Sequence, residues 1–119
     1  MTLPALPALA ALNALLAVGV GAMAAHALSD PQAKAWATTA ALYQLSHGVA
    51  VFALLAWRDT RDVRGGAWAL TVGTLCFGGA LDALALGAPR GVASLAPVGG
   101  MLMLGGWAWL IWVAARGRR

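Results

Sequence analysis

The stretch from residue 3 to residue 28, LPALPALAALNALLAVGVGAMAAHAL, decides the fold because it contains no Lys, Arg, Asp or Glu. A helix needs about 20 apolar residues to cross a hydrocarbon core of about 30 Å. We expect a retained transmembrane helix rather than a secretory signal, because no Lys or Arg precedes the stretch and its apolar run exceeds the ~7–15 residues of a signal.

Three similar stretches follow, and they leave almost no chain for a soluble domain. The four helices are predicted at about 3–28, 35–57, 66–86 and 92–115. The chain is 61% hydrophobic and only 10% charged, whereas soluble domains carry about 25% charged residues. We therefore expect residues 1–119 to form a single all-α domain, an integral membrane bundle of four transmembrane helices.

A faint repeat raises a second possibility for how this bundle is built. Residues 21–31 can be laid over residues 79–89 with identical residues at 6 of 11 positions. Such an offset, close to half of the chain, would fit two duplicated helical hairpins related by an axis along the membrane normal. Sequences rich in Ala, Leu and Gly also produce such matches by chance.

The positive charges predict an orientation. The turn between the second and third helices and the C-terminal tail each hold three arginines, whereas the other two turns hold only Lys34 and Arg90. Basic residues are enriched on the cytoplasmic side of membrane proteins. We expect a multi-pass protein of the bacterial inner membrane with both termini in the cytoplasm. The arginines form no basic face along a folded surface, so a nucleic acid is not an expected partner.

Small residues recur every four positions in two of the predicted helices. Such stripes permit close contact between helix backbones in a membrane. Besides the lipid bilayer, we expect partners of the same kind, either further copies of this chain or other membrane-protein subunits. The stripe residues are Ala17, Gly21 and Ala25 in the first helix and Gly79, Ala83 and Gly87 in the third.

The polar residues inside the second helix are the main candidates for chemistry. Tyr43 and His47 share one helix face by their spacing of four, and Gln44 lies three positions before His47. Lipid does not tolerate such a patch, so it is expected to face other helices or a polar cavity. The patch could be a hydrogen-bonded packing cluster, a proton relay, a binding site for a head group or a quinone-like ligand, or half of a metal or haem site.

His26 and Asp82 are predicted at similar depths near the outer ends of the first and third helices, on the side away from the cytoplasm. A hydrogen bond or ion pair between them is reasonable if these helices adjoin. Otherwise we expect Asp82 to be protonated, because burial disfavours a charged carboxylate. His26 and His47 are weak candidates for metal ligands, because Cys, Met or carboxylate ligands do not accompany them.

No motif of a known catalytic type accompanies these residues. The sequence has no nucleophile elbow, no phosphate loop and no zinc-type His spacing, so we expect neither enzymatic activity nor a cofactor. The leading hypothesis is a non-catalytic accessory or assembly subunit, or an oligomeric scaffold. The alternative is binding or transport of a proton, metal ion or small amphiphile in a polar intramembrane cavity around His47.

Several motifs in this order resemble the YgdD-like family. They are Asn13, Gly-Ala-x-x-Ala-His-Ala-Leu at 21–28, Trp36, Tyr43-Gln-x-x-His47, a Gly-rich third helix and Pro97-x-Gly-Gly100. The resemblance covers nearly the whole chain and implies a small four-helix protein of the bacterial inner membrane, with no activity assigned. The chain departs from the family at Met23-Ala24, where members often have Phe-Gly, and at Asp82, where an uncharged or aromatic residue is expected.

Overall fold

The computed structural model describes residues 4–117 and shows four long helices. They are α1 (Ala5–His26), α2 (Pro31–Trp57), α3 (Arg61–Ala85) and α4 (Leu95–Arg116), with a short 3-10 helix η1 (Arg90–Ser94) leading into α4. Each is long and apolar enough to cross a membrane. The all-α membrane fold predicted from the sequence is confirmed, and the described residues contain no strand.

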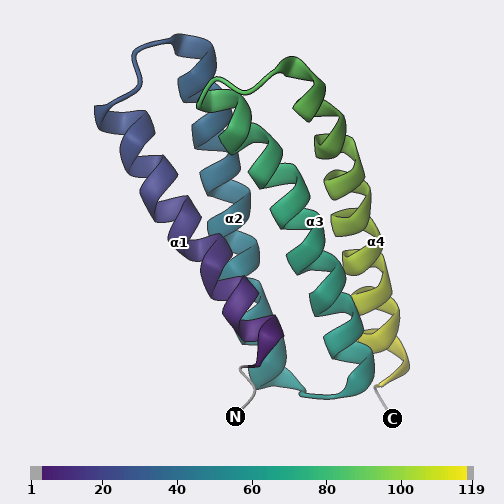
Figure 1. The fold of residues 1–119 in the computed structure, drawn as a ribbon. Coiled ribbons are helices and arrows are strands. Elements are labelled where there is room, and N and C mark those ends of the chain that lie inside the picture. The colour runs from purple at the N-terminus through teal and green to yellow at the C-terminus, as the bar shows by residue number, and fades with distance from the viewer. Residues whose placement is uncertain (1–3, 118–119) are drawn as a thin grey trace.

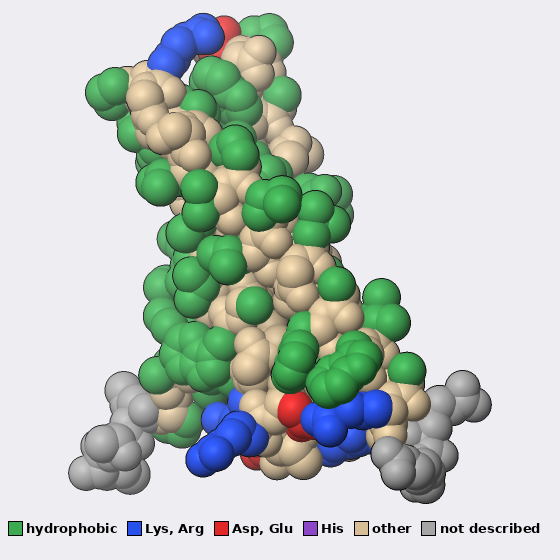
Figure 2. Space-filling view, turned by 90° about the vertical axis from the view of Figure 1, so that its right-hand side faces the viewer, with side chains coloured by type: hydrophobic (Ala, Val, Ile, Leu, Met, Phe, Trp, Pro, Cys, Tyr) green, Lys and Arg blue, Asp and Glu red, His purple; other side chains and the backbone are tan. Residues whose placement is uncertain are grey.

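Both ends of the described chain lie at the same end of the bundle (Figure 1). We call this the termini end; it also holds the α2–α3 loop. The opposite, loop end holds the α1–α2 and α3–α4 connections. Figure 2 shows Lys and Arg side chains gathered at the two ends on that face, with hydrophobic side chains over the surface between them. This distribution is the one expected of helices that span a bilayer.

Two helices begin earlier than the apolar pattern predicts, because their first turns carry polar residues. Pro31 occupies the first position of α2, and the Asp30 side chain accepts a hydrogen bond of 2.9 Å from the Ala33 amide. Both features favour a helix start. Helix α3 begins at Arg61, five residues before the predicted start at Gly66, and leaves only Arg58–Thr60 as a loop. The predicted start at residue 3 and the last two arginines lie outside the described residues.

Helix α3 is the centre of the fold and contacts all three other helices, while α1 packs on α2 and α4 packs on α3. Half of its apolar segment is buried, against less than a third of each of the others. The α1–α2 and α3–α4 hairpins are both present, whereas η1 occurs only in the second. Whether they arose by duplication stays a prediction.

The α1–α2 contact is built from alanine. Ala10, Ala17 and Ala24 are buried at intervals of seven residues along α1, the spacing of a left-handed coiled-coil seam. Gly48 of α2 fits closely against this seam, since a Cβ there would lie 2.7 Å from the Ala10 carbonyl oxygen. Small side chains thus bring the two backbones together.

The α3–α4 contact is built from glycine. Gly66 and Gly73 on α3 and Gly99 and Gly106 on α4 are each seven residues apart, and all four are buried. A Cβ at Gly73 would lie 2.7 Å from the Gly99 carbonyl oxygen, and one at Gly99 would collide with the Gly73 carbonyl oxygen. The two backbones therefore touch without intervening side chains.

The predicted small-residue stripes take only part in these contacts. Ala17 is buried and Gly21 lies at ordinary contact distance, 3.6 Å, from the Ala41 methyl, but Ala25 is exposed. In α3, a Cβ at Gly79 would meet no atom within 4 Å, and Ala83 is half-buried. Gly87 lies beyond the helix, with a φ of 96° that favours glycine. Among the described residues, the two glycines of the α3 stripe thus make no close helix contact.

Candidate functional site

An aromatic groove of about 340 Å³ lies between α2 and α4, with α3 as its floor. Tyr43 and His47 of α2 form one side, and Phe77 of α3 forms the floor. Tyr43 and Trp107 are 37% and 39% exposed, so the groove opens sideways at the apolar surface of the bundle. The remaining lining residues, all from α4, are Gly100, Met103, Leu104 and Trp107.

The hydrogen bonds of His47 define its protonation in this site. The Trp107 indole nitrogen donates to Nε2 of His47 at 3.1 Å. An indole can only donate, so Nε2 must carry a lone pair. The proton of the neutral imidazole is then on Nδ1, which lies 3.0 Å from the Tyr43 carbonyl oxygen and 3.2 Å from the Ser46 hydroxyl. His47 is therefore held as the neutral Nδ1–H tautomer.

Aromatic contacts connect the three helices around this histidine. The Tyr43 and Phe77 rings meet edge to face with centroids 4.8 Å apart, and the Tyr43 and Trp107 rings each lie 5.8 Å from the His47 ring. The Tyr43 hydroxyl makes no hydrogen bond to another described residue. The site thus offers a phenol hydroxyl and an imidazole inside apolar walls, a combination that suits a ligand with one polar head.

Sequence reasoning placed Tyr43, Gln44 and His47 in one patch, and the structure separates them. Gln44 follows Tyr43 by one position, so it points about 100° around the helix. Its side chain is fully buried against α3, where a Cβ at Gly78 would lie 2.6 Å from Cγ of Gln44. Gln44 therefore belongs to the bundle interior, not to the groove.

The predicted contact between His26 and Asp82 is not formed. His26 is exposed at the end of α1. Asp82 is only 8% exposed and faces Gln44. A helix rises about 1.5 Å per residue, so His47 lies about 24 Å along α2 from its start, far from His26. The described residues include no group of three or more His, Cys, Asp or Glu that could hold a metal ion.

Sequence reasoning missed Trp107 as a site residue. The available signal was its position: it lies in the interior of α4, whereas interfacial tryptophans gather at helix ends. An indole N–H inside hydrocarbon needs an acceptor, and His47 is the intramembrane histidine of the described chain. Pairing the two needed the tertiary arrangement, because they are 60 residues apart.

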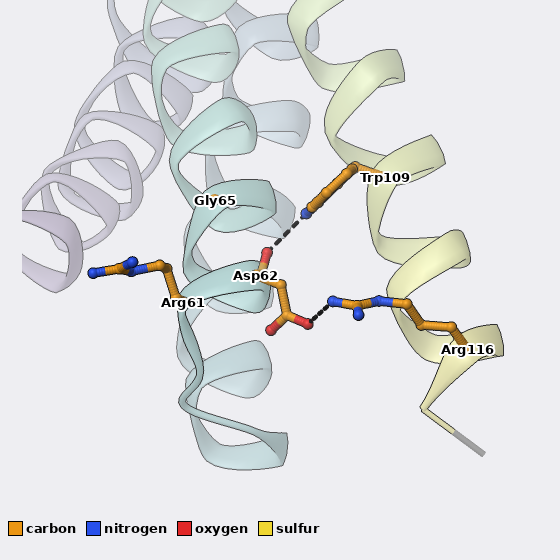
Figure 3. A pocket seen from close by; sticks show the side chains of 5 residues that line it. All are labelled: Arg61, Asp62, Gly65, Trp109 and Arg116. Atoms are coloured by element: carbon orange, nitrogen blue, oxygen red, sulfur yellow. Dashed lines mark hydrogen bonds and ion pairs between the residues drawn. The ribbon is translucent and has the colours of Figure 1, made fainter. Parts of the chain in front are cut away.

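A second pocket, of about 500 Å³, lies at the termini end (Figure 3). Arg116 of α4 forms an ion pair with Asp62 of α3, and the Trp109 indole donates to the Asp62 carbonyl oxygen at 2.8 Å. Arg61 points to the other side of α3. In the adjacent loop, hydrogen bonding to Arg64 lowers the pKa of Asp59. The ion pair and the Trp109 hydrogen bond tie α3 to α4 at the termini end.

Comparison with known proteins identifies relatives but no activity. The family described as "Protein of unknown function (DUF423)" matches residues 20–100. A UPF0382 membrane protein of Staphylococcus epidermidis is 38% identical over 105 residues, covering 83% of this chain and 85% of the relative. One of Haemophilus influenzae is 40% identical over 95 residues, covering 76% and 77%. No solved structure matches the chain. The expected kind of family is confirmed, and the YgdD-like name stays a resemblance.

Proposed function

For this chain, which belongs to the DUF423 family of membrane proteins, we propose a non-catalytic role in binding a small amphiphile in the groove between α2 and α4. The observation that carries the proposal is the oriented neutral His47 beside the Tyr43 hydroxyl, inside an apolar groove that opens toward lipid. Binding sites are typically apolar hollows with a few fixed polar groups.

The residues that line the groove form a polar part, which can bind a head group, and an apolar part, which can contact a ring or chain. Tyr43 can donate to or accept from a polar head, because a phenol hydroxyl does both. The Nε2 lone pair of His47 becomes a second acceptor when Trp107 moves aside. Phe77, Met103 and Leu104 provide apolar contact for a ring or chain, and an alkyl tail would continue into the bilayer.

Filling the groove tests this proposal. A Cβ at Gly100 would meet nothing within 4 Å, and Gly100 lines the groove. Gly100→Leu should therefore occupy the site without disturbing the α3–α4 contact. Gly105 is equally open but does not line the groove, so Gly105→Leu is the matched control.

The readout is photo-crosslinking of a diazirine-bearing long-chain alcohol to the protein in liposomes, with peptide mapping by mass spectrometry. We expect crosslinks at Tyr43, Phe77 and Met103 in the wild type and in Gly105→Leu, and severalfold fewer in Gly100→Leu. Equal crosslinking of all three proteins at these residues would contradict the groove as a binding site.

A role as an accessory subunit or oligomeric scaffold is the second candidate. It is favoured by surface glycines at which a Cβ would meet nothing within 4 Å, so that another helix could approach closely. These glycines include Gly19, Gly79 and Gly105. Native mass spectrometry of protein released gently from its own membrane would count subunits. A homo-oligomer or a stoichiometric partner subunit supports this role, and a bare monomer argues against it.

A further inference from the structure

The interior of the bundle holds polar atoms that have no hydrogen-bond partner at normal distance among the described residues. Six buried side-chain oxygen and nitrogen atoms lack a hydrogen-bond partner, and all belong to four residues: Asn13, Gln44, Thr74 and Asp82. Each of these residues is more than nine-tenths buried. A buried polar group without a hydrogen-bond partner destabilises the folded state, so such a concentration in a small protein calls for a physical explanation.

Two of these four residues, Thr74 and Asp82, lie on one face of α3. Thr71, Thr74, Gly78 and Asp82 succeed one another at intervals of three or four residues, which places them in a row. The row is about 16 Å long at a rise of about 1.5 Å per residue. Gln44 of α2 reaches the row at Gly78 and faces Asp82.

Asn13 of α1 reaches the row at its other end. Its Nδ2 atom lies 3.5 Å from the Thr71 carbonyl oxygen, while its Oδ1 atom has no partner. Three helices thus contribute polar groups to one line, which we call the polar track.

The polar track occupies only the half of the bundle toward the loop end. Asp82 lies one helical turn before the end of α3 at Ala85. Beyond Thr71, toward the termini end, the same interior is closed by an apolar cluster of Leu6, Ala10, Val51 and Ala67. Toward the loop end, a cluster of small side chains, Ala24, Ala33, Ala37 and Ala85, lies beyond Asp82. A path along the polar track would pass this cluster near the loop end, one helical turn from Asp82, and stop near the middle of the membrane.

Asp82 has no counter-charge in this interior. The titratable groups at the loop end, His26, Asp30, Lys34 and Arg90, are all exposed. The ion pairs of the described residues join Arg64 to Asp59 and Arg116 to Asp62, at the other end. Gln44, the side chain that Asp82 faces, is uncharged. A buried carboxylate without a paired charge is strongly disfavoured, whereas a carboxylic acid is tolerated.

We propose that Asp82, Gln44, Thr74 and Asn13 form a hydrated, proton-binding track that opens at the loop end and ends near mid-membrane. Water is suited to the orphaned groups, because it donates and accepts hydrogen bonds and typically bridges two to four polar partners. Asp82 exchanges its proton with this water: the carboxylate oxygen takes a proton from the loop side and returns it there.

A metal cation fits the same groups less well. Oxygen ligands of hard cations such as Ca²⁺ or Mg²⁺ converge within about 2.0–2.6 Å of one point. The polar track instead spreads its oxygens over about 16 Å. The inference is independent of the groove between α2 and α4, because Asp82, Gln44, Thr74 and Asn13 do not line that groove.

Water contact can be measured on the wild-type chain in liposomes by water-edited solid-state NMR. We expect magnetisation transfer from water to the side chains of Gln44, Thr74 and Asn13, and none to the buried methyl of Ala67. Thr74→Val should abolish transfer to Asn13 while keeping it at Gln44. Thr71→Val is the control and should leave transfer to Asn13 unchanged, because Thr71 contacts Asn13 through its backbone carbonyl oxygen and its hydroxyl donates to the Ala67 carbonyl oxygen at 2.8 Å. Absence of transfer to Gln44 and Thr74 would overturn the proposal.

Proton binding needs a separate readout. Dicyclohexylcarbodiimide is an apolar reagent that couples to protonated carboxyl groups, and adducts can be located by peptide mass spectrometry. We expect labelling of Asp82 in the wild type that falls as the pH on the loop side is raised and that is the same in Na⁺ and K⁺. Asp82→Asn should lose this adduct. Protection by Na⁺ at constant pH, or no adduct in the wild type at any pH, would overturn the proposal.

Discussion

At the scale of single residues, Trp107 determines what His47 can do. Its indole is the donor to Nε2, and the Tyr43 carbonyl oxygen faces Nδ1. Trp107→Phe keeps an aromatic ring and removes the donor. We expect a loss of about 0.5–1.5 kcal/mol in the free energy of unfolding. The imidazole ¹⁵N spectrum should also change, because Nε2 loses its hydrogen-bond donor and the Nδ1–H tautomer is no longer enforced.

Trp109→Phe is the matched control for this prediction. Its indole also donates a hydrogen bond, but to the Asp62 carbonyl oxygen near the termini end. The His47 nitrogen signals should be unchanged in that variant. If both variants leave them as in the wild type, the Trp107–His47 hydrogen bond does not exist in the membrane.

At the scale of helices, the backbone contact of α3 and α4 at Gly73 and Gly99 should tolerate no side chain. A methyl group at Gly73 would lie 2.7 Å from a backbone oxygen of α4, and one at Gly99 would collide with the backbone of α3. Backbone cannot yield as a flexible side chain does. We expect Gly73→Ala and Gly99→Ala each to cost about 1–3 kcal/mol or more, the usual range for overpacking. Unfolding followed by circular dichroism in mild detergent measures this.

Gly105→Ala tests whether the cost comes from contact or from the loss of glycine itself. Gly105 lies in the same helix as Gly99, with open space around its Cβ position. Alanine is favoured over glycine in a helix by about 1 kcal/mol, so this variant should be neutral or more stable. Equal destabilisation at Gly99 and Gly105 would refute a specific contact.

The positions of the helices could be predicted from the sequence, but the face that each helix buries could not. Hydropathy and length are properties of each segment alone, and they suffice for four spans. Which side is buried depends on the neighbouring helix. Gly78 and Gly79 are adjacent in sequence, yet a Cβ at Gly78 would strike Gln44 while one at Gly79 would meet nothing. The groove and the polar track needed the same tertiary information, since Trp107 and Asp82 come from helices distant in sequence from their neighbours in α2.

At the scale of the whole molecule, the asymmetry of charge predicts its orientation. The termini end carries Arg58, Arg61, Arg64 and Arg116 among the described residues, and the loop end carries Lys34 and Arg90. Arg64 and Arg116 are paired with acidic residues, but orientation depends on the basic residues rather than on net charge. We therefore propose that the termini end faces the cytoplasm.

Fusions at the C-terminus of the full chain test this orientation. A green fluorescent protein fusion should fluoresce, and an alkaline phosphatase fusion should be inactive, because only the latter needs export. Replacing Arg58, Arg61 and Arg64 with Gln should weaken the bias and yield a mixed population, whereas replacing Lys34 and Arg90 should leave it unchanged. Active phosphatase on the wild-type chain would show that the termini end faces away from the cytoplasm. The polar track would then open to the cytoplasm instead of the outside.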